Sequence, residues 1–541
     1  MAHDAAARRP LGATISNRQR LVVFAAIMLC MFLTALDQSI VATAIPRILA
    51  DLGGFQLLAW VFTSYLLAST VTIPIVGKLS DMFGRKSFLL WGVAIFVGSS
   101  AACGAAPNMI TLIVARGIQG IGSGLIVACV FATLGDLFTP LERAKYFAFF
   151  TGMFTFAQLV GPAFGGLLSD GPGWRWCFYI NLPLGIGASA FILTELPKGG
   201  GNGGRLADID VRGALLLAVS TISFMLGMTW SSSAYGWGSP ITLGLLAAAL
   251  VVAIVFVLNE RSHAQPIIPL TLFRNVPFVQ GVTMTFFSAA GIFASSQFMP
   301  TYVQTSLGNS ATISGLLVAP GAIGGLISSI FGGQLISRTG RFKRQMILGG
   351  TLLSIGAFLL SRLGPNESLY YIAGITMFMG LGGGLVFPVT QVVVQGAVSQ
   401  QEQGVASSTR QFFLLIGNTL GVALLGLVLT TSYISAFAAN SRDIAPIIPA
   451  ATYQQFNDPT LALEAGRYDA ARTTVRALPD GEAILQKALS AQRAAVATAI
   501  DHVYLGALAC ALGVLGMALA LREIQLRRSF DAEAHAAVEA I

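Results

Sequence analysis

Residues 77–89 read GKLSDMFGRKSFL, and residues 333–347 read GQLISRTGRFKRQMI. Both stretches follow the pattern G-x-L-x-[DS]-x-x-G-R and continue with further basic residues. Each stretch lies in a short polar break between two long apolar runs. A motif that recurs at corresponding places of two hydrophobic arrays indicates a membrane protein built from two similar halves.

The composition also favours lipid as the solvent for most of the chain. Of 541 residues, 55% are hydrophobic and 10% are charged, and the mean hydropathy is +0.73. Soluble domains carry about 25% charged residues. The net charge of +8 does not indicate nucleic-acid binding, because the basic residues form short clusters between apolar runs and are not interleaved with aromatics. We therefore expect a lipid bilayer, and no nucleic acid, as the partner.

No pattern in the sequence indicates a metal, a cofactor or ATP hydrolysis. The four histidines are scattered, the five cysteines form no C-x-x-C pair, and the phosphate-loop pattern G-x-x-x-x-G-K-[ST] does not occur. The segment KGGGNGG (198–204) is interpreted as a flexible linker. We therefore do not expect an enzyme, a metal site, a bound cofactor or an ATP-driven pump.

A helix needs about 20 apolar residues to cross a bilayer. The chain offers fourteen such runs, after two long charge-free stretches are divided at SSSAYGWGSP (231–240) and QTSLGNSAT (304–312). The two copies of the motif lie eight spans apart, whereas a plain duplication of six spans would place them six apart. Two additional spans are therefore expected between the halves. The predicted spans are 21–42, 57–76, 87–105, 109–133, 145–168, 178–195, 212–230, 240–258, 278–301, 312–336, 345–362, 369–393, 405–430 and 499–521.

The predicted fold class is an all-α integral membrane protein with two six-helix halves and two extra central spans. Lys and Arg concentrate in the breaks on one side, which predicts the cell (inner) membrane with both termini in the cytoplasm. The external loop has an amphipathic pattern in its second half, so we favour a packed hairpin over a partner-binding domain. The predicted parts are an N-terminal segment (1–20), a first half (21–195), a linker with two additional spans (196–260), a second half (278–521) that contains the external loop (431–498), and a tail (522–541).

Four further stretches narrow this expectation. They are LDQSIVATAIPRI (36–48), RGIQGIGSG (116–124), AQLVGPAFGGLL (157–168) and WRWCFYINLPLG (174–185). Together with the first loop they resemble the motifs of the major facilitator superfamily, and in particular of its fourteen-span drug:proton antiporters (EmrB/QacA-type). The resemblance covers nearly the whole chain. It implies the major facilitator fold, in which two six-helix halves surround a central cavity.

The sequence departs from the family's motifs at three places. Ala157 stands where a glycine is usual, and Ser39 stands where threonine is common. In the second loop, Ser337 replaces the aspartate. A latch in the second half would therefore be weaker, or would depend on the basic residues Arg341, Lys343 and Arg344.

The first loop is predicted to act as a latch that forms in one conformation and breaks in another. Its aspartate can accept a hydrogen bond from a helix N-terminus or from a nearby arginine, and its glycines allow a tight turn. An ordinary positive-inside loop is the alternative, but such a loop would not need the repeated glycines. The predicted latch residues are Gly77, Asp81, Gly84, Arg85 and Lys86.

Small residues at helical spacing in the fourth and fifth spans predict helices that pack closely and slide. We expect these contacts to permit the movement of the two halves. The residues concerned are Gly120, Gly124, Gly161, Pro162, Gly165 and Gly166.

Three charged residues stand out within the predicted spans: Asp37, Arg116 and Arg410. A charge inside a membrane costs about 2.5–3.5 kcal/mol or more, so each one is a candidate functional residue. Asp37 and Arg116 are at comparable depth, and a structural ion pair is one interpretation. We favour a proton site, because burial disfavours the carboxylate, a neighbouring arginine favours it, and its protonation would then depend on conformation and cargo. For Arg410, snorkelling to the interface and a functional role both remain open.

The favoured function is proton-coupled export of lipophilic or cationic drugs, or of similar small molecules, by alternating access. Export of a specific endogenous compound (a siderophore, lipid or metabolite) is the alternative, and a non-transporting scaffold or sensor is a third. A mostly apolar cavity with few polar groups suits lipophilic cations. The predicted cargo-path residues are Gln38, Tyr65, Gln158, Gln297, Gln391 and Arg410.

Overall fold

The computed structural model describes residues 11–54, 57–197, 204–233, 235–364, 367–459, 461 and 465–522. Within these ranges the ordered elements are helices, and no strand occurs. Most of the predicted linker at 198–204 lies outside the described residues, as do the first ten residues and the tail after residue 522.

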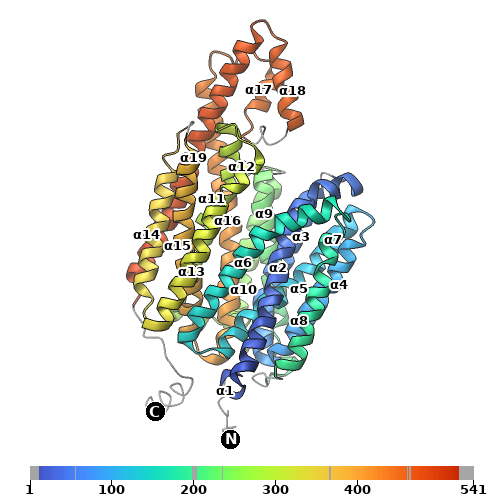
Figure 1. Ribbon diagram of the computed structural model, residues 1–541, viewed down its shortest axis with the longest axis vertical. Coiled ribbons are helices and arrows are strands. Elements are labelled where there is room, and N and C mark those ends of the chain that lie inside the picture. The colour runs from blue at the N-terminus through green and yellow to red at the C-terminus, as the bar shows by residue number, and fades with distance from the viewer. Residues whose placement is uncertain are drawn as a thin grey trace.

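The helices follow one another in three groups (Figure 1). The first half comprises α1 (Leu11–Thr14), α2 (Asn17–Leu52), α3 (Leu58–Phe83), α4 (Arg85–Gly104), α5 (Met109–Leu137), α6 (Pro140–Asp170), α7 (Trp176–Tyr179) and α8 (Asn181–Glu195). Two additional helices follow, α9 (Val211–Ser233) and α10 (Pro240–Ser262). The second half comprises α11 (Val276–Thr301), α12 (Ala311–Leu316), α13 (Ala319–Thr339), α14 (Lys343–Leu360), α15 (Leu369–Gly396), α16 (Gln403–Asn440), α17 (Ala450–Phe456), α18 (Ala465–Arg476) and α19 (Gly481–Ala520).

Thirteen helical segments of the described chain are long and apolar enough to cross a membrane. They match thirteen of the fourteen predicted spans. The remaining predicted span, 345–362, corresponds to α14, which has 18 residues and begins with Lys343 and Arg344. It packs between α15 and α19 within the bundle (Figure 1). The chain is therefore a multi-pass membrane protein of the predicted all-α class.

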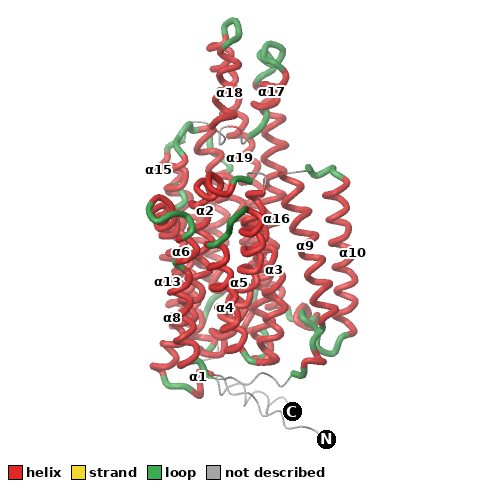
Figure 2. The backbone as a smooth tube through the Cα atoms, turned by 90° about the vertical axis from the view of Figure 1, so that its right-hand side faces the viewer, coloured by secondary structure: helices red, strands yellow, loops and turns green. Residues whose placement is uncertain are grey.

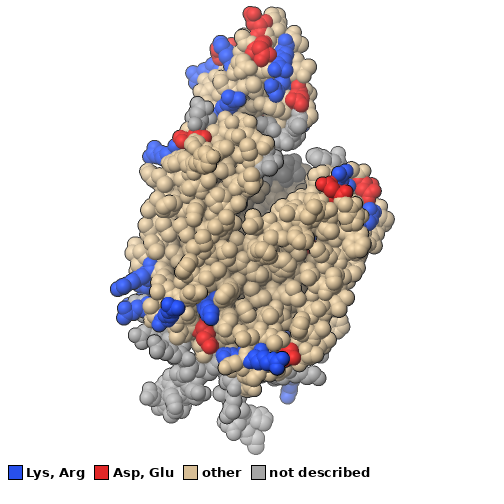
Figure 3. Space-filling model, viewed as in Figure 1, with Lys and Arg blue, Asp and Glu red and all other residues tan. Residues whose placement is uncertain are grey.

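The two halves touch at one end of the molecule and diverge at the other. They meet through α6 with α13 and α15, and through α16 with α3 and α5. Figure 3 shows a hollow between them at the end that carries α17 and α18, which we call the hairpin end. At the opposite end, which carries residues 77–89 and is called the loop end, Gln395 Nε2 donates to the carbonyl of Phe131 at 3.0 Å. There Ser329 Oγ also donates to the carbonyl of Ala148 at 3.0 Å.

The two additional helices pack against each other and reach the rest of the bundle through α3 and α16. Figure 2 shows them beside the bundle. Near the loop end, Lys78 Nζ donates to Gln265 Oε1 at 2.8 Å. Toward the hairpin end, the rings of Trp60 and Trp230 lie 5.9 Å apart. The first contact ties the segment after α10 to α3, and the second ties α9 to α3.

The segment predicted as an external loop at 431–498 is largely helical. α16 continues to Asn440 and α19 begins at Gly481, so two spans extend beyond the bundle and are joined through α17 and α18. These four helical parts share an apolar core with the second half, which includes Phe437, Phe456 and Leu485. The helices continue past the apolar runs, because packing of an apolar face stabilises helix outside the bundle as well.

Candidate functional site

The first site lies inside the first half, where Asp37 of α2 meets Arg116 of α5. Both side chains are buried, with 0% and 1% exposure, and Asp37 Oδ2 lies 2.5 Å from Arg116 Nη1. The guanidinium Nε donates to the carbonyl of Val61 at 3.3 Å. The face of the guanidinium lies over the ring of Tyr65, 4.3 Å from its centroid. The sequence placed this acid and this base at similar depth, and the fold brings them into direct contact.

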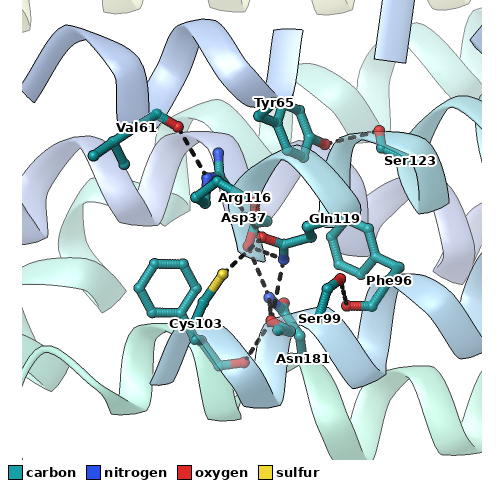
Figure 4. A network of polar contacts seen from close by, with 12 residues as sticks. Asp37, Val61, Tyr65, Phe96, Ser99, Cys103, Arg116, Gln119, Ser123 and Asn181 are labelled. Atoms are coloured by element: carbon teal, nitrogen blue, oxygen red, sulfur yellow. Dashed lines mark hydrogen bonds and ion pairs between the residues drawn. The ribbon is translucent and has the colours of Figure 1, made fainter. Parts of the chain in front are cut away.

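Two amide side chains complete the surroundings of the carboxylate (Figure 4). Gln119 Nε2 and Asn181 Nδ2 each donate to Asp37 Oδ1 at 2.9 Å. Both amides also donate to Ser100 Oγ, at 3.1 and 2.9 Å. An ionised carboxylate accepts from both amides and from Arg116 at once, because it has acceptor sites only. Asp37 therefore joins α2 to α5 and α8, and Ser100 links α4 to the same two amides.

Three members of this site were not predicted from the sequence: Gln119, Asn181 and Ser100. Gln119 follows Arg116 by three residues and so lies on the same face of α5. Asn181 belongs to the stretch 174–185 and begins α8. A polar residue within an apolar span was the available signal in each case, but sequence alone does not say which helices pack together.

The second site is the latch at the loop end, where α3 of the first half meets α16 of the second half. Asp81 Oδ2 accepts a hydrogen bond from the backbone N–H of Val405 at 2.9 Å, near the start of α16. Arg85 Nη2 lies 3.0 Å from Asp81 Oδ1. Arg85 Nη1 lies 2.5 Å from Asp136 Oδ2 of α5, an acid that the sequence analysis did not select. One acid of the first half thus binds the positive end of a helix in the other half.

Glycines allow this close approach. A Cβ on Gly77 would overlap Ser408, and a Cβ on Gly404 would overlap the Asp81 carboxylate. Gly84 ends α3 with a φ of 97°, which disfavours any other residue. The fifth latch residue, Lys86, points elsewhere and donates to the carbonyl of Leu193 at 2.8 Å.

The second copy of the loop does not form a corresponding latch. Ser337 Oγ donates to the carbonyl of Gln334 in its own helix at 2.8 Å. The basic residues Arg341, Lys343 and Arg344 make no ion pair with any residue that the structure describes. With serine in place of the aspartate, the described residues of the second loop make no counterpart of the Asp81 hydrogen bond, although Gly333 packs directly on Ala144 of α6.

The small residues of α5 and α6 divide into two groups. Gly120 and Gly124 pack against α3, and Gly161 and Gly165 pack against α2, so that a Cβ at any of them would overlap a neighbour. Ser39 Oγ donates to the carbonyl of Ala157 at this α2–α6 contact, at 3.1 Å. By contrast, a Cβ at Gly166 would meet nothing within 4 Å. Pro162 is exposed, so these two residues take no part in the close packing.

The predicted cargo-path residues also fall into two groups. The side chains of Gln38, Gln158 and Gln297 are exposed, although they lie in span helices. Tyr65 is buried, and its hydroxyl donates to Ser123 Oγ at 2.8 Å. Gln391 and Arg410 are also buried. Arg410 is 3% exposed and bonds to Gln391, so it does not snorkel to the interface as one interpretation allowed.

No group of three or more His, Cys, Asp or Glu side chains among the described residues is arranged to hold a metal ion.

Comparison with known proteins agrees with this architecture. Residues 27–422 match the Major Facilitator Superfamily profile. The chain is 38% identical over 411 residues to the multidrug transporter protein MdtP of Bacillus subtilis (strain 168), covering 76% of this chain and 75% of the relative. It is 33% identical to multidrug resistance protein 3 of the same organism, covering 89% and 91%.

Solved structures match at the level of the fold. The human organic anion transporter MFSD10 (TETRAN) superposes with a TM-score of 0.58 at 15% identity, covering 91% of this chain and 99% of that chain. The proton:xylose symporter XylE superposes with a TM-score of 0.57 at 15% identity, covering 86% and 97%. The sequence match over most of its length, together with this fold, shows that the chain belongs to the Major Facilitator Superfamily.

Proposed function

We propose that this protein exports lipophilic, in part cationic, small molecules in exchange for protons, by alternating access. The relatives named as multidrug transporters support export of drug-like cargo. In this proposal the loop end faces the cytoplasm and the hollow at the hairpin end opens to the outside. The basic residues that gather at the loop end in Figure 3 support this orientation, since positive charge is enriched on the cytoplasmic side.

The observation that carries the proposal is the Asp37 network. Asp37 is fully buried, and its two oxygens accept hydrogen bonds from three side chains on two other helices. A protonated carboxyl group must donate one hydrogen bond, so it cannot keep this arrangement. Protonation of Asp37 would therefore change the contacts among α2, α5 and α8, which couples proton binding to helix packing.

Cargo reaches the same network through Tyr65. Its ring covers the Arg116 guanidinium. Gln38 is exposed on α2, one residue after Asp37. A cargo molecule that displaces Tyr65 would also disturb Arg116, and through it Asp37. In this cycle Gln158 and Gln297 contribute further polar contacts to the path, and the latch at Asp81 holds the loop end closed while the hollow is open to the outside.

The test uses proteoliposomes with an imposed pH gradient and a pH-sensitive dye inside. We expect lipophilic cations to trigger proton movement with the unmodified protein, and we expect Asp37→Asn to reduce it at least tenfold. Asp170→Asn is the matched control, because Asp170 is an exposed acid of the same half that pairs with Arg47 at 2.9 Å. Undiminished proton movement with Asp37→Asn would exclude Asp37 as the proton site.

A further inference from the structure

Arg410 of α16 is a buried cation in surroundings that carry no opposite charge. It is 3% exposed, and no carboxylate lies within 4.0 Å of it among the described residues. Its hydrogen-bond partners are the neutral side chains of Gln391, Thr285, Thr390 and Gln411. Buried charges are normally paired, so a lone one requires an explanation.

The contacts of the guanidinium are uneven. Its Nε donates to Gln391 Oε1. Its outer nitrogens hold only long contacts: Nη1 lies 3.5 Å from Thr285 Oγ1 and 3.4 Å from Thr390 Oγ1, and Nη2 lies 3.4 Å from Gln411 Oε1. These two nitrogens form the edge that binds a carboxylate with two parallel hydrogen bonds. Arg410 is thus anchored through Nε, while its carboxylate-binding edge is weakly engaged.

The position of Arg410 places it at the contact between the halves. Its guanidinium lies over the ring of Phe131 from α5 of the first half, 5.7 Å from the centroid. Gln395, one turn from Gln391 on α15, donates to the carbonyl of Phe131 at 3.0 Å. Alternating access requires these loop-end contacts to separate. When they do, Phe131 leaves Arg410, which then faces the opening on that side.

We infer that Arg410 is a binding site for an anionic group of the cargo, a carboxylate in the first instance, when the loop end is open. This inference rests on the proposed export function and adds a cargo class to it. The anion supplies the charge that the protein itself does not place beside Arg410. Gln391 holds the guanidinium, and the Nη1–Nη2 edge makes the contact. When the loop end closes again, Phe131 covers Arg410 and the site is no longer open to the cytoplasmic side.

The test compares two forms of one fluorescent xanthene dye, the free carboxylate and its methyl ester, which differ in this group alone. Uptake is measured in proteoliposomes with an acidic lumen, so that transport from the loop end fills the vesicle. We expect the ratio of the KM of the carboxylate to the KM of the ester to rise at least tenfold in Arg410→Gln. Arg410→Lys keeps the positive charge but lacks the pair of nitrogens that binds both carboxylate oxygens, so it should give an intermediate KM ratio. This variant also tests the inference if Arg410→Gln does not fold.

Arg362→Gln is the matched control. Arg362 is an exposed arginine of the same half that also lies over a phenylalanine, Phe358, at 5.4 Å. Its ratio should equal that of the unmodified protein. An unchanged ratio in Arg410→Gln, or uptake of the ester without the carboxylate by the unmodified protein, would overturn the inference while leaving export intact. Uptake of neither form would count against the export function and the inference together.

Discussion

Two buried arginines in this protein are satisfied in different ways. Arg116 lies 2.5 Å from the carboxylate of Asp37 and within a network of amides. Arg410, equally buried, contacts neutral side chains and the ring of Phe131. Both charges are expensive inside a membrane. The charge of Arg116 is balanced by Asp37, within a network that joins four helices. The charge of Arg410 is left for an anionic group that comes with the cargo.

The largest expected effect comes from breaking the paired arginine. Arg116→Met leaves Asp37 as a buried acid without its cation, which costs about 3–5 kcal/mol in the free energy of unfolding. Arg410→Met removes a charge that has no opposite partner, so we expect a much smaller loss or none. Thermal unfolding of both variants in detergent, followed by tryptophan fluorescence, measures the difference.

A double variant sharpens this result. Arg116→Met combined with Asp37→Asn removes both charges, so its unfolding temperature should recover part of the loss. A loss of stability in Arg410→Met as large as in Arg116→Met would show that the two sites are equivalent, and the comparison would then fail.

The next effect concerns the contact that positions Asp37. Gly161 faces Ser39 on α2, two residues beyond Asp37, and a side chain there would overlap it. Gly161→Leu should reduce transport to less than a tenth while the protein still inserts, because overpacking moves α2 against α6. Gly166→Leu is the control, since its Cβ meets open space. Equal transport rates in the two variants would exclude a role for this contact.

The repeated loop offers a third and smaller test. Asp81→Ala removes the hydrogen bond to the start of α16, which should weaken closure of the loop end by about 1–3 kcal/mol. We expect faster labelling of a cysteine introduced at Ala406, which is buried in the closed state. Ser337→Ala at the corresponding place of the second loop should change nothing, because Ser337 bonds only within its helix. Identical labelling in both variants would show that the latch does not hold the loop end closed.

Much of the fold was predictable because a helix that crosses a bilayer needs a long apolar run, and such runs are visible in the sequence. The apolar runs, the loop repeat and the eight-span spacing between its copies were sufficient to predict an all-α bundle with two additional helices. The ends of helices were not predictable in the same way. α16 and α19 continue past the apolar runs, since amphipathic packing around Phe437 stabilises helix outside the bundle as well.

The residues of the candidate sites were likewise predictable only in part. Asp37 and Arg116 were selected because a charge inside an apolar span is conspicuous. Asn181 and Asp136 were not, since their roles depend on which helices meet, and no local pattern carries that information. For Arg410 the sequence left open whether the side chain reaches the membrane interface. The answer depends on how α16 packs against α5, which is a property of the tertiary structure.

The smallest expected effect is at an exposed pair on the hairpin, Asp443 and Lys487, whose charged atoms lie 2.8 Å apart. The hydrogen bond from Lys487 holds the pKa of Asp443 below its usual value. Any stabilisation is therefore present at neutral pH and is lost as the pH falls through this lowered pKa. Because both side chains are more than half exposed, water screens the attraction, and exposed pairs contribute little. We expect Lys487→Ala to unfold at the same temperature as the unmodified protein at neutral pH, where Asp443 is ionised. A clear decrease there would show that the attraction between two close charges does not depend on burial in this protein, contrary to the difference between Arg116 and Arg410.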